Sequence, residues 1–298
     1  MRRAPLIECF LATILVLPAA CRRPQSDQQE SVHDPRKFTP DTIALVDARV
    51  QVIRDELVTL PDHPWSGEYY CGDGLGVNLR LLLAPAAGFV FTWNGCLGTY
   101  DRNYGAVTSD DAGRVLLHCE FPNDRRGFQG TATVFVPIRW GDRQYLVAED
   151  EMLEFCNAVN SGLARGAERP RFLLRYDPSG TPPRVDGDPR LPPQYQSLLR
   201  RDSIRGAVRS VGPRTTTRSA GGTEFHTTEI TLDVGRAHGV FVGMELFVER
   251  PEVFDTVRVA SVGEHFAVAT ITQICRPTPR PKTGWQVSSR FHNDDIAN

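Results

Sequence analysis

The chain lacks the sequence motifs by which many catalytic sites are recognised. It has no Cys-x-x-Cys pair and no Gly-x-Ser-x-Gly motif, which weighs against a zinc or thioredoxin-like site and against a serine hydrolase. The glycine-rich residues 72–76 lack the lysine and the following helix of a phosphate-binding loop, so they are typical of a turn. None of the seven histidines lies at ligand spacing from another. The sequence therefore predicts no metal site, no cofactor and no catalytic residue.

Lysine is also scarce. Lys37 and Lys282 are the only lysines among 34 basic residues, and the formal net charge is -2. Proteins that bind nucleic acid usually carry a clear excess of basic residues, so we expect no nucleic-acid partner. We interpret the preference for arginine as the codon bias of a GC-rich genome rather than as a sign of phosphate recognition.

The N-terminus has the order of an export signal. Arginines 2 and 3 precede the apolar residues 10–17, which are too few to span about 30 Å of hydrocarbon, and small residues follow up to Cys21. The residues before Cys21 resemble the lipobox of bacterial lipoproteins, although Pro18 stands where that family usually has leucine. The resemblance implies a lipid on Cys21, an anchor in a membrane, and a location in the bacterial cell envelope, on the periplasmic side. Ordinary cleavage near Ala20 is the alternative.

Five cysteines follow this signal, namely Cys71, Cys96, Cys119, Cys156 and Cys275. An odd number leaves at least one thiol outside any internal disulfide. A bridge between Cys71 and Cys96 would join two loops of the first domain, and the sequence leaves this pairing open.

The remaining chain divides by composition and hydrophobic periodicity. We expect a signal peptide over residues 1–21, a flexible tether over 22–38, an amphipathic helix over 39–60, a β-meander domain with one helix over 61–176, a proline-rich linker over 177–198, a small β-barrel over 199–292 and a tail over 293–298. The predicted fold class is mostly β with minor α: an antiparallel, barrel-like meander followed by a small SH3-like β-barrel.

Two local patterns support this division. Thr39 and Pro40 form a helix start, and apolar residues then recur every three or four positions as far as Pro61. We expect this helix to pack on its own domain rather than form a coiled coil. Between residues 77 and 93, apolar and polar residues alternate on both sides of a short turn, which predicts a hairpin with Phe89, Phe91 and Trp93 in the core.

Two resemblances concern the domains. Residues 232–248, in which a strand is followed by the glycine-bounded turns His-Gly and Gly-Met, resemble the C-terminal small barrel of the flagellar assembly protein T family. This resemblance implies an envelope scaffold or interaction module without catalytic residues. A second resemblance begins at Gly67-Glu68-Tyr69 and continues through the hairpin that follows: it is to the lipocalin-like barrels of bacterial envelope lipoproteins. The copper-resistance members of that family carry two cysteines just after the first strand, and here the second one is missing.

A polar cluster near the hairpin supplies the candidate ligand-binding residues Trp93, Tyr100, Asp101, Arg102 and Tyr104. We interpret residues 100–104 as a loop at the mouth of a barrel, where polar groups above an apolar interior can hold a ligand. A turn stabilised by its own Asp and Asn residues is the simpler interpretation.

Three functions follow. The first hypothesis is a non-catalytic, exported, lipid-anchored binding or scaffold protein with an envelope-protein or cell-wall partner. The second is a small-ligand carrier with its pocket at the mouth of the first barrel. The third is an enzyme whose site is assembled from Cys96, His118 or Asp101; a cysteine nucleophile would need a histidine and a third, orienting group.

Overall fold

The structure of the protein is a computed structural model that describes residues 34–72, 74, 76–125, 128–165, 171–176, 184–219, 222–249, 255–274 and 279–291. The predicted export signal, the lipidation site Cys21 and Cys275 lie outside these residues. No helix in the described part of the chain is both long and apolar enough to cross a bilayer.

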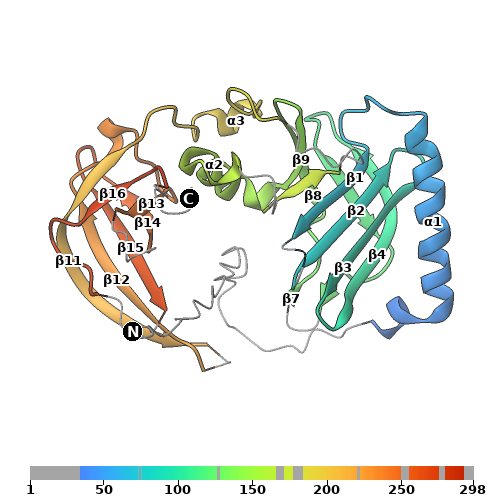
Figure 1. The fold of residues 1–298 in the computed structure, drawn as a ribbon, viewed down its shortest axis with the longest axis horizontal. Helices are drawn as coiled ribbons and strands as arrows, with labels where there is room; N and C mark the ends of the chain where they lie inside the picture. The colour runs from blue at the N-terminus through green and yellow to red at the C-terminus, as the bar shows by residue number, and fades with distance from the viewer. Residues whose placement is uncertain are drawn as a thin grey trace, which may run out of the picture.

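The protein is mostly β and contains two closed barrels, which Figure 1 shows on either side of a helical layer. This confirms the predicted fold class, whereas the SH3-like subtype stays a prediction.

The first barrel has eight antiparallel strands in the order β1-β10-β9-β8-β5-β4-β3-β2. Their bounds are β1 Gly67–Gly72, β2 Asn78–Ala84, β3 Gly88–Gly95, β4 Gly98–Ser109, β5 Val115–Cys119, β8 Val134–Trp140, β9 Arg143–Ala148 and β10 Leu173–Arg175. The strands β6 Asp124–Arg125 and β7 Phe128–Gln129 form a separate two-stranded sheet. β10 closes the barrel by pairing with both β1 and β9.

Alternating residues of these strands fill the first barrel. Phe89, Phe91 and Trp93 are buried there with Leu81, Leu83 and other apolar side chains from across the barrel. An eight-stranded barrel can be filled by its own side chains or can hold one small ligand. Here the buried apolar cluster occupies the interior.

Helix α1, Pro40–Val58, lies on the outside of the first barrel (Figure 1). Thr39 caps it, since its hydroxyl accepts a hydrogen bond from the Thr42 N–H, and Pro40 occupies the first turn, where no intrahelical N–H bond is lost. Val46 and Ile53 are buried against the outer faces of β2 and β3. The helix thus packs on its own barrel.

The second barrel has six strands in the order β11-β12-β15-β14-β13-β16. Their bounds are β11 Arg205–Arg218, β12 Glu224–Leu232, β13 Glu245–Val248, β14 Thr256–Val262, β15 Ala267–Ile274 and β16 Gln286–Ser288. A 3-10 helix, η5 Arg236–His238, occupies the predicted turn, and Gly239 after it has a positive φ of 83°, which explains why glycine stands there.

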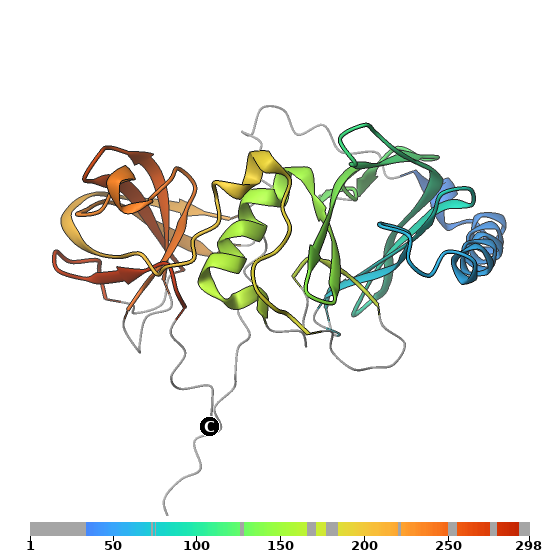
Figure 2. The ribbon, with the colours of Figure 1, turned by 90° about the horizontal axis from the view of Figure 1, so that it is seen from above.

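Helix α2, Met152–Ser161, lies between the barrels in both Figures 1 and 2. It follows η3, Glu149–Glu151, and ends at Gly162, whose φ of 86° is the usual left-handed cap; η4, Leu163–Arg165, comes next. One face of α2, with Phe155 and Cys156, is buried against the outside of β8 and β9.

The other face of α2 contacts the second barrel through polar groups. Asn157 donates from Nδ2 to the Gly243 carbonyl at 2.9 Å and accepts from the Glu245 N–H at 3.2 Å. Arg258 of β14 forms ion pairs with Glu154 at 2.8 Å and with Glu245 at 2.6 Å. Because Asn157 is 3% exposed, these contacts fix one arrangement of α2 against the second barrel.

The proline-rich segment differs from the predicted linker. From residue 184 onward it packs on the first barrel and on α2: Leu191 is buried, the Trp140 indole donates to the Gly187 carbonyl at 2.9 Å, and a short helix α3, Pro193–Gln196, follows. The predicted linker is therefore a packed segment in the part that the structure describes from residue 184 onward. The reason is that Trp140 and its neighbours on the outer face of the barrel supply partners that the segment's composition does not reveal.

Candidate functional site

The predicted loop over residues 100–104 is part of strand β4, so the loop interpretation is wrong. The turn between β3 and β4 is short, and the strand resumes at Gly98. Successive strand residues point to opposite faces, so these side chains cannot converge on one mouth. Asp101 is buried inside the barrel, whereas Tyr104 packs outside against α1, with the Arg49 guanidinium 4.9 Å from its ring centre.

A bulge explains the position of Tyr100. Trp93 pairs with Asp101 and Asn94 pairs with Thr99, which leaves Tyr100 as an extra residue in β4. Its ring lies over Gly95, where any Cβ would collide with it, and contacts Trp93 edge to face with 5.0 Å between ring centres. Tyr100 and Trp93 are thus brought together by packing.

Arg102 and Asp101 belong to different environments. The Arg102 guanidinium stacks 5.1 Å from the Phe38 ring, and burial lowers its pKa. The Asp101 carboxylate accepts from Lys37 Nζ at 3.4 Å, and both residues are 0% exposed. Lys37 belongs to η2, Pro35–Phe38, so this ion pair fastens the segment before α1 to the interior of the first barrel.

The residues proposed for an enzyme site do not come together. Cys96 is exposed in the turn between β3 and β4, and Asp101 faces the barrel interior. His118 faces outward from β5, where its Nε2 lies 2.9 Å from the Thr108 hydroxyl. The barrel wall separates the histidine from the carboxylate, so the three side chains form no triad.

The thiols inside the protein are poorly suited to nucleophilic chemistry. Burial raises the pKa of both Cys71 and Cys156 to about 12, and it raises that of Cys119. A thiol rather than a thiolate is therefore present at neutral pH. Cys71 faces the core while Cys96 lies in the exposed turn, and no disulfide joins these two described residues. The described residues also contain no group of three or more His, Cys, Asp or Glu side chains that could hold a metal ion.

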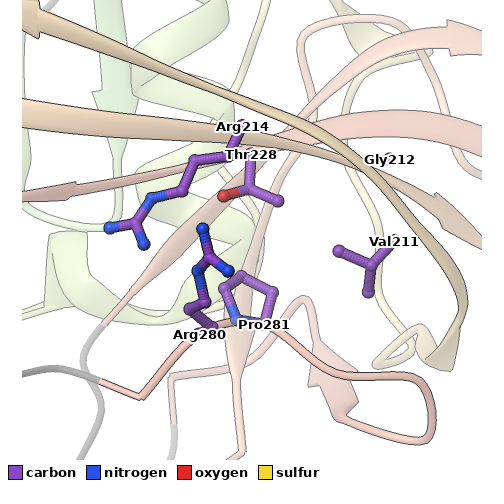
Figure 3. A pocket seen from close by; sticks show the side chains of 6 residues that line it. All are labelled: Val211, Gly212, Arg214, Thr228, Arg280 and Pro281. Carbon is purple, nitrogen blue, oxygen red and sulfur yellow. The ribbon is translucent and has the colours of Figure 1, made fainter.

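A pocket with polar and charged walls lies in the second barrel. Its volume is about 220 Å³, and it is lined by Val211, Gly212, Arg214, Thr228, Arg280 and Pro281 (Figure 3). We refer to these six residues as the β11 pocket. Val211, Gly212 and Arg214 belong to β11, Thr228 to β12, and Arg280 and Pro281 to the segment that leads to β16.

A bulge in β11 shapes this pocket. Val211 pairs with Ile230 and Arg214 pairs with Thr228, so residues 212 and 213 of β11 stand opposite a single residue of β12. Proline cannot donate a ladder hydrogen bond and glycine weakens a strand, which is why Gly-Pro is suited to this position. The bulge turns Arg214 onto the same face as the buried Thr228.

Beyond the bulge, β11 pairs with β12 alone among the described strands. β16 pairs only with residues 205–207 of β11, and the last contact is the hydrogen bond from the Gly284 N–H to the Val208 carbonyl at 2.8 Å. The segment with Arg280 and Pro281 lies beside the pocket instead of a paired strand. The β11 pocket thus forms where the barrel seam opens.

The polar atoms of the pocket have little internal compensation. Thr228 is 3% exposed, and its Oγ1 has no hydrogen-bond partner among the described residues; the same holds for Arg214 Nε. Neither Arg214 nor Arg280 forms an ion pair within the described part of the chain. Buried polar groups are usually paired, so these two atoms are placed to bond to water or to a ligand in the pocket.

Acidic and amide groups nearby are engaged or face away. Buried Gln273 donates from Nε2 to the Asp255 carboxylate at 2.6 Å and to the Pro279 carbonyl at 3.2 Å. Glu229 is exposed on the opposite face of β12 from Thr228, although its carboxylate approaches Gly212. The two arginines therefore dominate the charge of the pocket.

The sequence did not identify this site. The preference for arginine was attributed to codon bias, so neither Arg214 nor Arg280 was singled out. The Gly-Pro pair within a β-branched strand is the signal that could have indicated it. No protein-family model, no curated protein and no solved structure matches the chain.

Proposed function

We propose that the protein is a non-catalytic binding or scaffold protein of the bacterial cell envelope, exported and anchored by a lipid on Cys21. Its recognition site for an envelope-protein or cell-wall partner is the β11 pocket. The single observation that supports this choice is that Thr228 Oγ1 and Arg214 Nε have no hydrogen-bond partner among the described residues and line one pocket with Arg280, because a binding partner can supply the missing hydrogen bonds.

Packing of the first barrel favours this function over a small-ligand carrier. Phe89 and Phe91 are at most 2% exposed and are embedded in a continuous apolar cluster that extends across the interior. The residues expected at a binding mouth are instead used in the wall and in the contacts with α1 and η2. The first barrel therefore serves as the structural base of the molecule.

The test is crosslinking of the tagged full-length protein in intact cells of its own species. We expect Arg214→Glu and Arg280→Glu to remove particular crosslinked species that Arg209→Glu retains. Arg209 is an exposed residue of the same strand outside the pocket, so this control makes the same change of charge. An identical set of crosslinked species for all three variants would contradict the assignment of the site.

Anchoring is tested separately by mass spectrometry of the mature N-terminus. Cleavage before Cys21 with acyl chains on its sulfur and amino group is the expected result. An unmodified Cys21 would exclude the lipid anchor and leave the recognition site untouched.

A further inference from the structure

We propose that the β11 pocket binds a compact oxyanion, a carboxylate or a phosphate group, held between Arg214 and Arg280 and completed by the Thr228 hydroxyl. This inference rests on the proposed function, because it takes the β11 pocket as the recognition site. To that function it adds the chemical class of the ligand.

Charge is the first argument. The Arg214 and Arg280 guanidinium groups come from separate segments of the chain and point toward the same side of the pocket (Figure 3). Two cations that share a pocket repel each other, and neither is neutralised by an acid of the described residues. An anion between them converts this repulsion into two attractive contacts. Guanidinium groups also match the planar, paired oxygens of carboxylate and phosphate.

Hydrogen bonding is the second argument. The Thr228 hydroxyl points toward the side of the pocket where the two guanidinium groups lie (Figure 3), and its oxygen has no partner in the described structure. A hydroxyl can donate to an anionic oxygen, and Arg214 Nε, which also lacks a partner, can donate to a second oxygen. Both unsatisfied groups thus find acceptors in the same ligand. A chloride ion is a single atom and would match the two donors less well than two separate oxygens.

The shape of the site is the third argument. A volume of about 220 Å³ accommodates a small charged group and a few attached atoms. Val211 and Pro281 form an apolar part of the pocket wall beside the charged groups. They can contact the carbon atoms attached to a carboxylate or a phosphate ester. The bulge places the backbone of Arg214 opposite Thr228, so the Arg214 side chain leaves the strand on the side of the pocket.

The experiment is calorimetric titration of the full mature chain with sodium phosphate and, separately, with sodium acetate, at constant ionic strength set by sodium chloride. We expect saturable binding of at least one anion. Arg214→Gln and Arg280→Gln should each weaken it by about tenfold or more, as expected for a charge-assisted hydrogen bond. Thr228→Val should weaken it by a smaller factor, and Arg209→Gln should leave it unchanged.

The two titrations distinguish the ligand sources. Binding of phosphate alone assigns a phosphate ester, and binding of acetate alone assigns a carboxylate. Absence of saturable binding of both anions, or equal binding by Arg209→Gln and Arg214→Gln, would overturn the oxyanion site. Arg280 is exposed, so Arg280→Gln retains the fold and keeps the test decisive if a β11 variant unfolds.

Failure of this inference is separable from failure of the proposed function. Crosslinking that depends on Arg214 without binding of either anion would retain the recognition site and reject the oxyanion. Anion binding without crosslinking that depends on Arg214 would retain the oxyanion site and reject its role in recognition of an envelope partner.

Discussion

Lys37→Met provides the most demanding test of the first barrel. Lys37 and Asp101 are both fully buried, and their charged atoms are 3.4 Å apart. Removal of the lysine charge leaves a carboxylate in an interior that water does not reach. Breaking a buried pair in this way costs about 3–5 kcal/mol of unfolding free energy. The loss is large because the buried carboxylate loses its counter-charge, rather than because the pair itself is strongly stabilising.

The measurement is urea denaturation of the full chain followed by tryptophan fluorescence, because Trp65, Trp93 and Trp140 all lie in or on the first barrel. The matched control is Lys282→Met, the same substitution at the only other lysine, which is exposed. We expect the control to stay within about 0.5 kcal/mol of the unmodified protein.

A double variant separates the two explanations. Lys37→Met combined with Asp101→Asn removes both charges, so it should be more stable than Lys37→Met alone. A loss below about 1 kcal/mol for Lys37→Met would refute the buried-pair reasoning. Equal stability of the single and double variants would show that packing rather than charge accounts for the loss.

Three further predictions concern other parts of the chain. Burial, together with Asp150 and Glu154, raises the pKa of Glu151 from 4.5 to about 7, so the folded state favours the protonated acid. Stability measured by urea midpoints should therefore rise as pH falls from about 7 to 4.5, and the rise should be smaller in Glu151→Gln. An equal rise in both proteins would contradict the assignment of this pH dependence to Glu151. The exposed Cys96 should react with a thiol reagent at pH 8 much faster than Cys71, whose pKa of about 12 keeps it protonated. A Cys96 that is labelled only after reduction would instead indicate a disulfide. Gly243→Ala should lower the melting temperature, because Gly243 has a φ of 83° and the new Cβ would lie 2.5 Å from the Leu153 side chain of α2. An unchanged melting temperature would refute that contact.

Local patterns in the sequence identified the elements that depend on local interactions. The Thr39-Pro40 start determines where α1 begins, and the alternation around Phe89 and Phe91 determines which side of β3 faces the core. These features follow from the periods of helix and strand, and they do not require knowledge of distant partners.

Features that depend on distant partners were not predicted. The path of β4 through Tyr100 and Asp101 was interpreted as a loop, because its polar residues obscure the strand period. The counter-charge of Asp101 inside the barrel comes from Lys37, which is 64 positions earlier in the sequence. In the same way, the β11 pocket needs Arg280, which is far from Arg214 in sequence and is brought there by closure of the barrel.

The contacts of α2 determine how the molecule responds to a pull. A chain of two domains joined by a slack linker would let one domain swing before any force reached the other. Here Asn157 binds the second barrel while Phe155 is buried against the first, and the proline-rich segment packs along both α2 and the barrel. A force on the second barrel would therefore reach the first barrel through the contacts of α2 and of the proline-rich segment, without the slack of an extended linker.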